Sequence, residues 1–203
     1  MKPKCLLISS PIVAVALMLA ANATAIPIDY VANLNGPKES PPNGSPGTGA
    51  VTATFDLTTH KLDLHVTFSG LTSGTTAAHI HAPTLTPFSG VAGVATQVPF
   101  FVNFPIGVTS GTYDQTFNTL DSSFYNPAFL TANGGTAASA EAAFAQALGQ
   151  NKAYFNIHTE NFGSGEIRGF LHVPDASSTM LCLGMSLIGL EMFRRKFGAQ
   201  LNA

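Results

Sequence analysis

Basic residues are scarce in this chain, which has 9 Lys and Arg among its 203 residues. Four of them lie between positions 26 and 172, against nine acidic residues, so this interval carries a formal charge of −5. A protein that binds nucleic acid gathers Lys and Arg on one surface to neutralise phosphates. The shortage of positive charge therefore excludes nucleic acid as an expected partner.

Cysteine is absent from the same interval, because Cys5 and Cys182 both lie in apolar segments near the ends of the chain. The central part can form no disulfide, so its stability must come from packing. It also has no thiol nucleophile, no Gly-x-Ser-x-Gly elbow and no glycine-rich phosphate loop. With no set of residues typical of catalysis, we expect a protein without enzymatic activity.

Apolar runs occur only near the two ends, and the first covers residues 5–21. It follows Lys2 and Lys4 and is followed by Ala23-Thr24-Ala25. A basic start, an apolar run and an A-x-A exit are the parts of a secretory signal peptide, so we predict cleavage by signal peptidase after Ala25. A lipoprotein would need a cysteine at the far end of the run, whereas Cys5 stands at its beginning.

The second apolar run covers residues 180–193, is interrupted by Glu191 and precedes Arg194-Arg195-Lys196. It is shorter than the roughly 20 residues that a membrane-spanning helix needs, so it would be a marginal permanent anchor. The basic tail would stay on the cytoplasmic side of the membrane. One interpretation of this arrangement is an ordinary short C-terminal anchor.

A second interpretation comes from the motif Val173-Pro174-Asp175, which stands before the apolar run. Motif, run and basic tail together resemble the PEP-CTERM class of bacterial sorting signals, in its Val-Pro-Asp variant. The resemblance implies a transient membrane association that ends when an exosortase-type sorting enzyme removes the tail, during export to the surface of a Gram-negative bacterium. The chain then divides into a signal peptide (1–25), a central domain (26–172) and a sorting signal (173–203).

The central interval consists mostly of short runs that alternate apolar and polar residues, separated by Gly, Pro, Asn and Ser. Such runs are typical of strands joined by turns. We expect strands near residues 50–57, 61–68, 76–81, 98–102, 111–117, 154–158 and 166–172. Their spacing favours an all-β fold, either an antiparallel sandwich or a barrel.

Helices are expected at three places. Residues 137–148 are rich in Ala, Glu and Gln and are followed by Gly149, which predicts one short helix packed across an end of the sheet. The apolar segments at both termini are also expected to be helical.

Five segments, taken in order, resemble one known family. They are Leu34-Asn35-Gly36 with Glu39-Ser40-Pro41-Pro42, Phe55-Asp56, Ala78-His79-Ile80-His81, Tyr154-Phe155-Asn156-Ile157-His158-Thr159, and Gly165-Glu166-Ile167-Arg168-Gly169. Together they resemble the CHRD domain, a module named from repeats in chordin. The resemblance implies a β-rich fold and an extracellular setting. We therefore expect an exported binding or structural module of the cell surface or extracellular matrix, with surface polysaccharide or matrix proteins as partners.

Three histidines are candidate metal ligands: His79 and His81 in one expected strand, and His158 in another. Alternate residues of a strand point to the same face, so the first two imidazoles lie within reach of each other. Three imidazoles from neighbouring strands would suit copper or zinc. The His-x-His pair is also similar to one in copper-zinc superoxide dismutases, which implies a redox-active alternative with dismutase-like geometry. In the competing interpretation the histidines form a structural polar row without metal.

Glu166 and Arg168 are two positions apart in an expected strand and so share a face. They are expected to pair with each other or with His158, either for ligand recognition or as a structural ion pair at the end of the barrel. The structural pair is favoured, because buried charges need partners.

Overall fold

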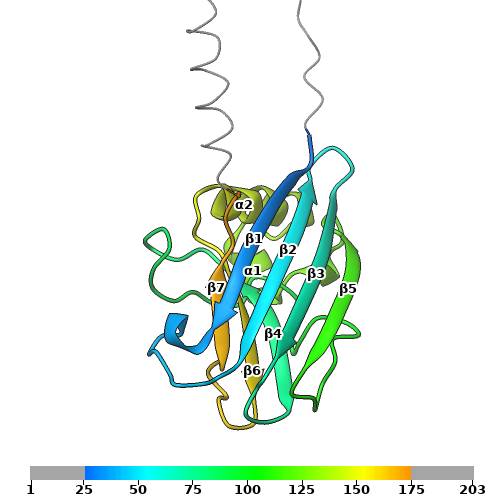
Figure 1. Cartoon of the computed structure of the whole chain (residues 1–203). Helices are drawn as coiled ribbons and strands as arrows, with labels where there is room; N and C mark the ends of the chain where they lie inside the picture. Colours follow the sequence, from blue (N-terminus) through cyan, green and yellow to red (C-terminus); the bar gives the residue numbers. More distant parts are fainter. Residues whose placement is uncertain (1–25, 175–203) are drawn as a thin grey trace, which may run out of the picture.

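The strands of this protein form one curled antiparallel sheet with two helices at one of its ends (Figure 1). The computed structural model describes residues 26–174. The strands are β1 (Ile28–Asn35), β2 (Thr48–Asp56), β3 (Lys61–Ser69), β4 (Thr75–His81), β5 (Gly111–Asn118), β6 (Tyr154–Thr159) and β7 (Ile167–Phe170). The predicted signal peptide with Ala25, and the C-terminal segment from Asp175 onward, lie outside the described residues, as do the helices expected there.

The seven strands follow the order β4-β6-β7-β1-β2-β3-β5, and every neighbouring pair is antiparallel. The prediction of a mainly β fold with antiparallel strands is confirmed. All described strands belong to the same sheet, so the architecture is a half-barrel, whereas the expected fold was an antiparallel sandwich or barrel.

A long loop explains why the sheet stays open. Residues 82–110 connect β4 and β5, which are the two edge strands. Phe101 of this loop is fully buried, and its ring lies 6.0 Å from that of Phe155 in β6 and 5.3 Å from that of Phe117 in β5. The loop therefore fills the inside of the curl. The expected strand at 98–102 is wrong, because these residues belong to the loop and Pro99 has no N–H to donate to a ladder.

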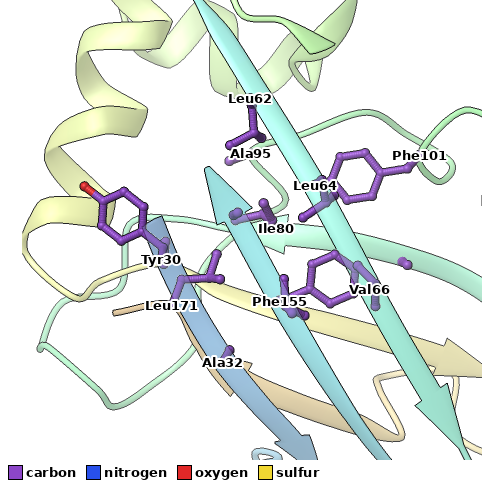
Figure 2. Close-up of a cluster of buried hydrophobic side chains, with 14 of the residues drawn as sticks. Tyr30, Ala32, Leu62, Leu64, Val66, Ile80, Ala95, Phe101, Phe155 and Leu171 are labelled. Atoms are coloured by element: carbon purple, nitrogen blue, oxygen red, sulfur yellow. The ribbon is translucent and has the colours of Figure 1, made fainter. Parts of the chain in front are cut away.

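Alternation along the strands produces the core. Leu62, Leu64 and Val66 of β3 are buried, and the residues between them face outward. Their partners across the ladder in β2 are the buried Phe55, Ala53 and Val51, so the same face of both strands is apolar. Figure 2 shows this face meeting Phe101 and Phe155 inside the curl.

Two helices cover one end of the sheet. The predicted helix is confirmed as α2 (Ala137–Gly149), which Thr136 caps together with Ser139. Its Phe144 ring meets that of Phe55 edge-on at 6.0 Å. The second helix, α1 (Pro127–Ala132), was not predicted, although the Asn126 cap and a proline at the first helical position are typical start signals.

The described chain begins and ends at the same end of the domain. His172 exchanges backbone hydrogen bonds with Val31 near the start of β1, at 2.8 and 3.1 Å, and Figure 1 shows both ends beside α2. The strand β1 was also missing from the expected strands, although its Tyr30, Ala32 and Leu34 are buried in alternation. Among residues 26–174, none of the helices has the length and apolar character to cross a membrane.

Candidate functional site

The three histidines lie together on the face of β4 and β6 that points away from the core. Ala78 and Ile80 of β4 are buried in the core, so His79 and His81 project to the opposite side. In the register of the two strands, His158 lies opposite Ala77, which makes it a diagonal neighbour of His79. The structure therefore brings together the three residues that the sequence analysis selected.

The loop that follows β4 runs along the free edge of that strand and covers two of the histidines. The amide of Ala95 donates to the carbonyl of Ile80 at 2.9 Å, and Val94 forms a bridge with His81. His79 and His81 are only 6% and 9% exposed as a result. His158 stays partly accessible. The cluster is thus a nearly dry site with one accessible member.

The distances within the cluster are short. Each imidazole can offer one nitrogen as a ligand such that the three atoms lie within 4.8 Å of one another. Nδ1 of His79 and Nε2 of His158 are 3.4 Å apart. The ring of His81 stacks on that of Tyr154 at 4.8 Å, which holds its orientation.

Each imidazole also contacts one backbone carbonyl. These contacts join Nε2 of His79 to Pro99 at 2.6 Å, Nδ1 of His81 to Ala92 at 3.0 Å, and Nδ1 of His158 to Gly163 at 3.0 Å. A carbonyl oxygen only accepts, so the contacting ring nitrogen carries the proton. A neutral imidazole has a single N–H, and the other nitrogen of each ring therefore has a free lone pair. That nitrogen in His81, Nε2, is buried without a hydrogen-bond partner.

Burial keeps these imidazoles neutral. It is the largest cause that lowers the pKa of both His79 and His81 to about 4, against the opposing effect of their carbonyl hydrogen bonds. Burial also lowers the pKa of His158. At neutral pH all three rings are therefore free of charge and able to act as ligands.

A second polar cluster, formed by Glu39, Asn156 and Arg168, is buried on the same face. Nδ2 of Asn156 donates to Glu39 at 2.7 Å, and Arg168 lies 3.8 Å from Glu39 and 4.8 Å from the centre of the Tyr154 ring. Burial raises the pKa of Glu39 to about 7, although Arg168 opposes the shift. Gly165 has a φ of +129°, and a Cβ there would collide with the side chain of Asn156, so this position needs glycine.

The predicted pair of Glu166 and Arg168 does not form. Arg168 instead makes its ion pair with Glu39. The fully buried carboxylate of Glu166 accepts hydrogen bonds from Ser45 and Thr159, both at 2.6 Å, and from the amide of Thr72 at 2.7 Å. Glu39 was not among the predicted site residues, because its only signal was a place in the family motif and its partners lie more than 100 positions away.

A cleft of about 510 Å³ adjoins the second cluster. The segment between β1 and β2 (residues 36–47) supplies one wall, including Lys38, Glu39 and Pro42. Phe88 and Phe170, with rings 6.2 Å apart, supply the other, and Arg168 also lines the cleft. The cleft therefore combines aromatic surface with two cations.

We expect acid to destabilise the metal-free protein through His79 and His81. Their pKa falls from 6.5 unfolded to about 4 folded, so the unfolded state binds more protons between these values. Stability is then lost as the pH falls through this window, by up to about 1.4 kcal/mol per pH unit for each histidine. Urea unfolding of the full chain at pH 7, 6 and 5, with a chelator present, measures the slope.

Glu39 has the opposite effect on the pH dependence of stability, so a variant of Glu39 serves as the comparison for the histidine variants. Its pKa rises from 4.5 to about 7 on folding, so its contribution to stability decreases as the pH rises through that range. Glu39→Gln should steepen the loss in acid, and a His79→Gln/His81→Gln double variant should flatten it. Identical slopes in all three proteins would contradict the assignment.

The fold and the site together define a class: a β-rich half-barrel domain with a buried histidine cluster and an adjoining cleft. The profile of the CHRD domain family matches residues 30–171, and the chain belongs to this family. The family resemblance found in the sequence is thereby confirmed. Comparison with curated proteins and with solved structures gave no match.

Proposed function

We propose that this protein is an exported, non-enzymatic CHRD module that binds surface or matrix polysaccharide through the cleft beside Arg168. The composition of the cleft carries the proposal. Phe88 is 54% exposed there and faces Phe170. Aromatic rings pack against the apolar faces of sugar rings. Lys38 and Arg168 supply charged donors for sugar hydroxyl or carboxylate groups.

Export to the surface of a Gram-negative cell is supported by the two terminal segments of the sequence. A basic, apolar and A-x-A pattern precedes the domain, and Val173-Pro174-Asp175 with its apolar run and basic tail follows it. The described domain begins and ends at one of its ends, as the pairing of Val31 with His172 requires. In this proposal signal peptidase and an exosortase-type enzyme process the chain, and membrane association is transient.

Fractionation of producing cells tests both parts of the proposal. We expect the natural chain in the surface fraction, with a mass that lacks Arg194-Arg195-Lys196. Phe88→Ala should be exported and processed in the same way as the natural chain but released into the medium. Its binding to isolated surface polysaccharide should be about tenfold weaker, which corresponds to a loss of about 1.4 kcal/mol of binding free energy. Leu85→Ala is the matched control, because Leu85 is exposed on the same loop and does not line the cleft.

The outcomes separate the two parts. A surface form that retains the basic tail would refute the sorting proposal. Equal retention of Phe88→Ala and the natural chain at the cell surface would refute the cleft as the binding site. If retention of the natural chain is lost after protease treatment of the matrix but not after glycan digestion, the partner is a matrix protein instead.

A further inference from the structure

The lone pairs of two imidazoles face each other in the histidine cluster with no proton between them, and the third imidazole, His81, has a free buried nitrogen. The carbonyl contacts place the single N–H of each neutral ring on its far side. Nδ1 of His79 and Nε2 of His158 therefore meet at 3.4 Å as two acceptors. A hydrogen bond between them would require one ring to abandon its carbonyl or to take up a second proton. The two lone pairs repel each other, whereas a cation between the rings would accept both of them as ligands.

A purely structural polar row does not account for His81. Buried polar atoms in folded proteins nearly always have a partner, since an unsatisfied one costs about 1–3 kcal/mol. Nε2 of His81 has none, although the side chain is 91% buried and held in place by Tyr154. His81 belongs with His79 and His158 to one group whose ligand atoms, one from each residue, lie within 4.8 Å of one another. The only nitrogen of His81 that is free to bind a metal is therefore a buried atom without a partner.

The geometry agrees with coordination. Two nitrogens bound at about 2.0–2.1 Å to one ion, with tetrahedral or trigonal angles, lie about 3.3–3.6 Å apart, and the pair of His79 and His158 lies at 3.4 Å. The third nitrogen lies within 4.8 Å of the others, so a shift on the order of 1 Å completes the set. Imidazoles that bind metals typically donate their other N–H to a carboxylate or carbonyl, as all three do here.

Charge distinguishes between the candidate ions. The group of ligands contains no Asp, Glu or Cys, so nothing in it neutralises a cation. The positive charge of Arg168 also acts on the site: burial is the main cause that lowers the pKa of His81, and the charges of the two other histidines and of Arg168 add to it. The cost of burying an ion grows with the square of its charge, so a dication is penalised far more than a monovalent ion. Zinc also favours a fourth ligand, whereas Cu⁺ accepts three nitrogens.

We propose that His79, His81 and His158 bind one Cu⁺ ion through Nδ1, Nε2 and Nε2, in preference to Zn²⁺. This metal site is separate from the cleft and does not depend on the polysaccharide ligand. The proposal concerns binding and includes no redox reaction.

Competition with chromophoric chelators tests the proposal. The full chain with Cys5→Ser and Cys182→Ser, solubilised in mild detergent, is titrated with Cu⁺ without oxygen and, separately, with Zn²⁺. These two substitutions remove the thiols that would also bind Cu⁺. We expect one equivalent of Cu⁺ and an X-ray absorption spectrum with nitrogen ligands only. His158→Gln, at the accessible member, should weaken Cu⁺ binding by at least about 100-fold.

Controls make each result decisive. His65→Gln changes a histidine on the exposed face of β3, paired with Asp114, and should leave Cu⁺ binding unchanged. Urea unfolding shows whether His158→Gln remains folded. The X-ray absorption spectrum is recorded on the protein with all three histidines, so it tests the site even if this variant unfolds. Failure to bind Cu⁺, or unchanged binding in folded His158→Gln, would overturn the site. Zinc bound as tightly as Cu⁺ would overturn the choice of ion.

Discussion

Replacing Glu166 with alanine should lower the free energy of unfolding by about 3–6 kcal/mol. The substitution leaves the buried hydroxyls of Ser45 and Thr159 and the partly buried amide of Thr72 without their acceptor. Each unsatisfied donor costs about 1–3 kcal/mol. Equilibrium unfolding in urea measures the loss, with stability compared at pH 7.

Two further variants define the cause of this loss. Glu166→Gln retains an acceptor oxygen but turns the other oxygen into a donor, so it should fall between the natural protein and Glu166→Ala. Glu160→Ala changes an exposed carboxylate nearby in the chain and should stay within about 0.5 kcal/mol of the natural protein. A loss below about 1 kcal/mol for Glu166→Ala would show that water replaces the carboxylate, contrary to the expectation.

Phe101→Ala should cost about 3–5 kcal/mol, the usual range for removing a buried phenyl ring. The side chain is fully buried, although it belongs to a loop, and it contacts the rings of Phe117 and Phe155 from two strands that are not neighbours in the sheet. The cavity would open between the loop and the inside of the curl. Urea unfolding provides the measurement.

The adjacent residue offers the matched control for this prediction. Val102 is 46% exposed in the same loop, and only its backbone takes part in hydrogen bonds with Gln97 and Tyr113. Val102→Ala should therefore change stability by less than about 1 kcal/mol. Similar losses in both variants would contradict the assignment of Phe101 to the core.

Local periodicity was sufficient for most of the strands. The alternation in β2 and β3 predicts which side chains are buried, because the face of a side chain depends only on its position along the strand. Alanine-rich composition similarly located α2. The loop at 98–102 was misread as a strand because its Phe101 is buried through contacts with distant strands, which a local pattern does not contain.

In the candidate site, too, local spacing predicted some features, and contacts between distant residues decided the others. The His-x-His spacing alone placed His79 and His81 on one face, and five ordered segments gave the family. The spacing of Glu166 and Arg168 did not decide whether they pair. Arg168 pairs with Glu39, and Glu166 accepts hydrogen bonds from Ser45 and Thr72, all in loops far away in the sequence.

The sequence by itself determined an antiparallel β domain of the CHRD family and identified three histidines as candidate metal ligands. Only the tertiary structure decided that β4 and β6 are neighbours, which ring nitrogens are free and which carboxylate pairs with Arg168. The physical reason is range. Side-chain direction follows from the local backbone, whereas strand order, hydrogen-bond partners and burial depend on contacts between residues widely separated along the chain.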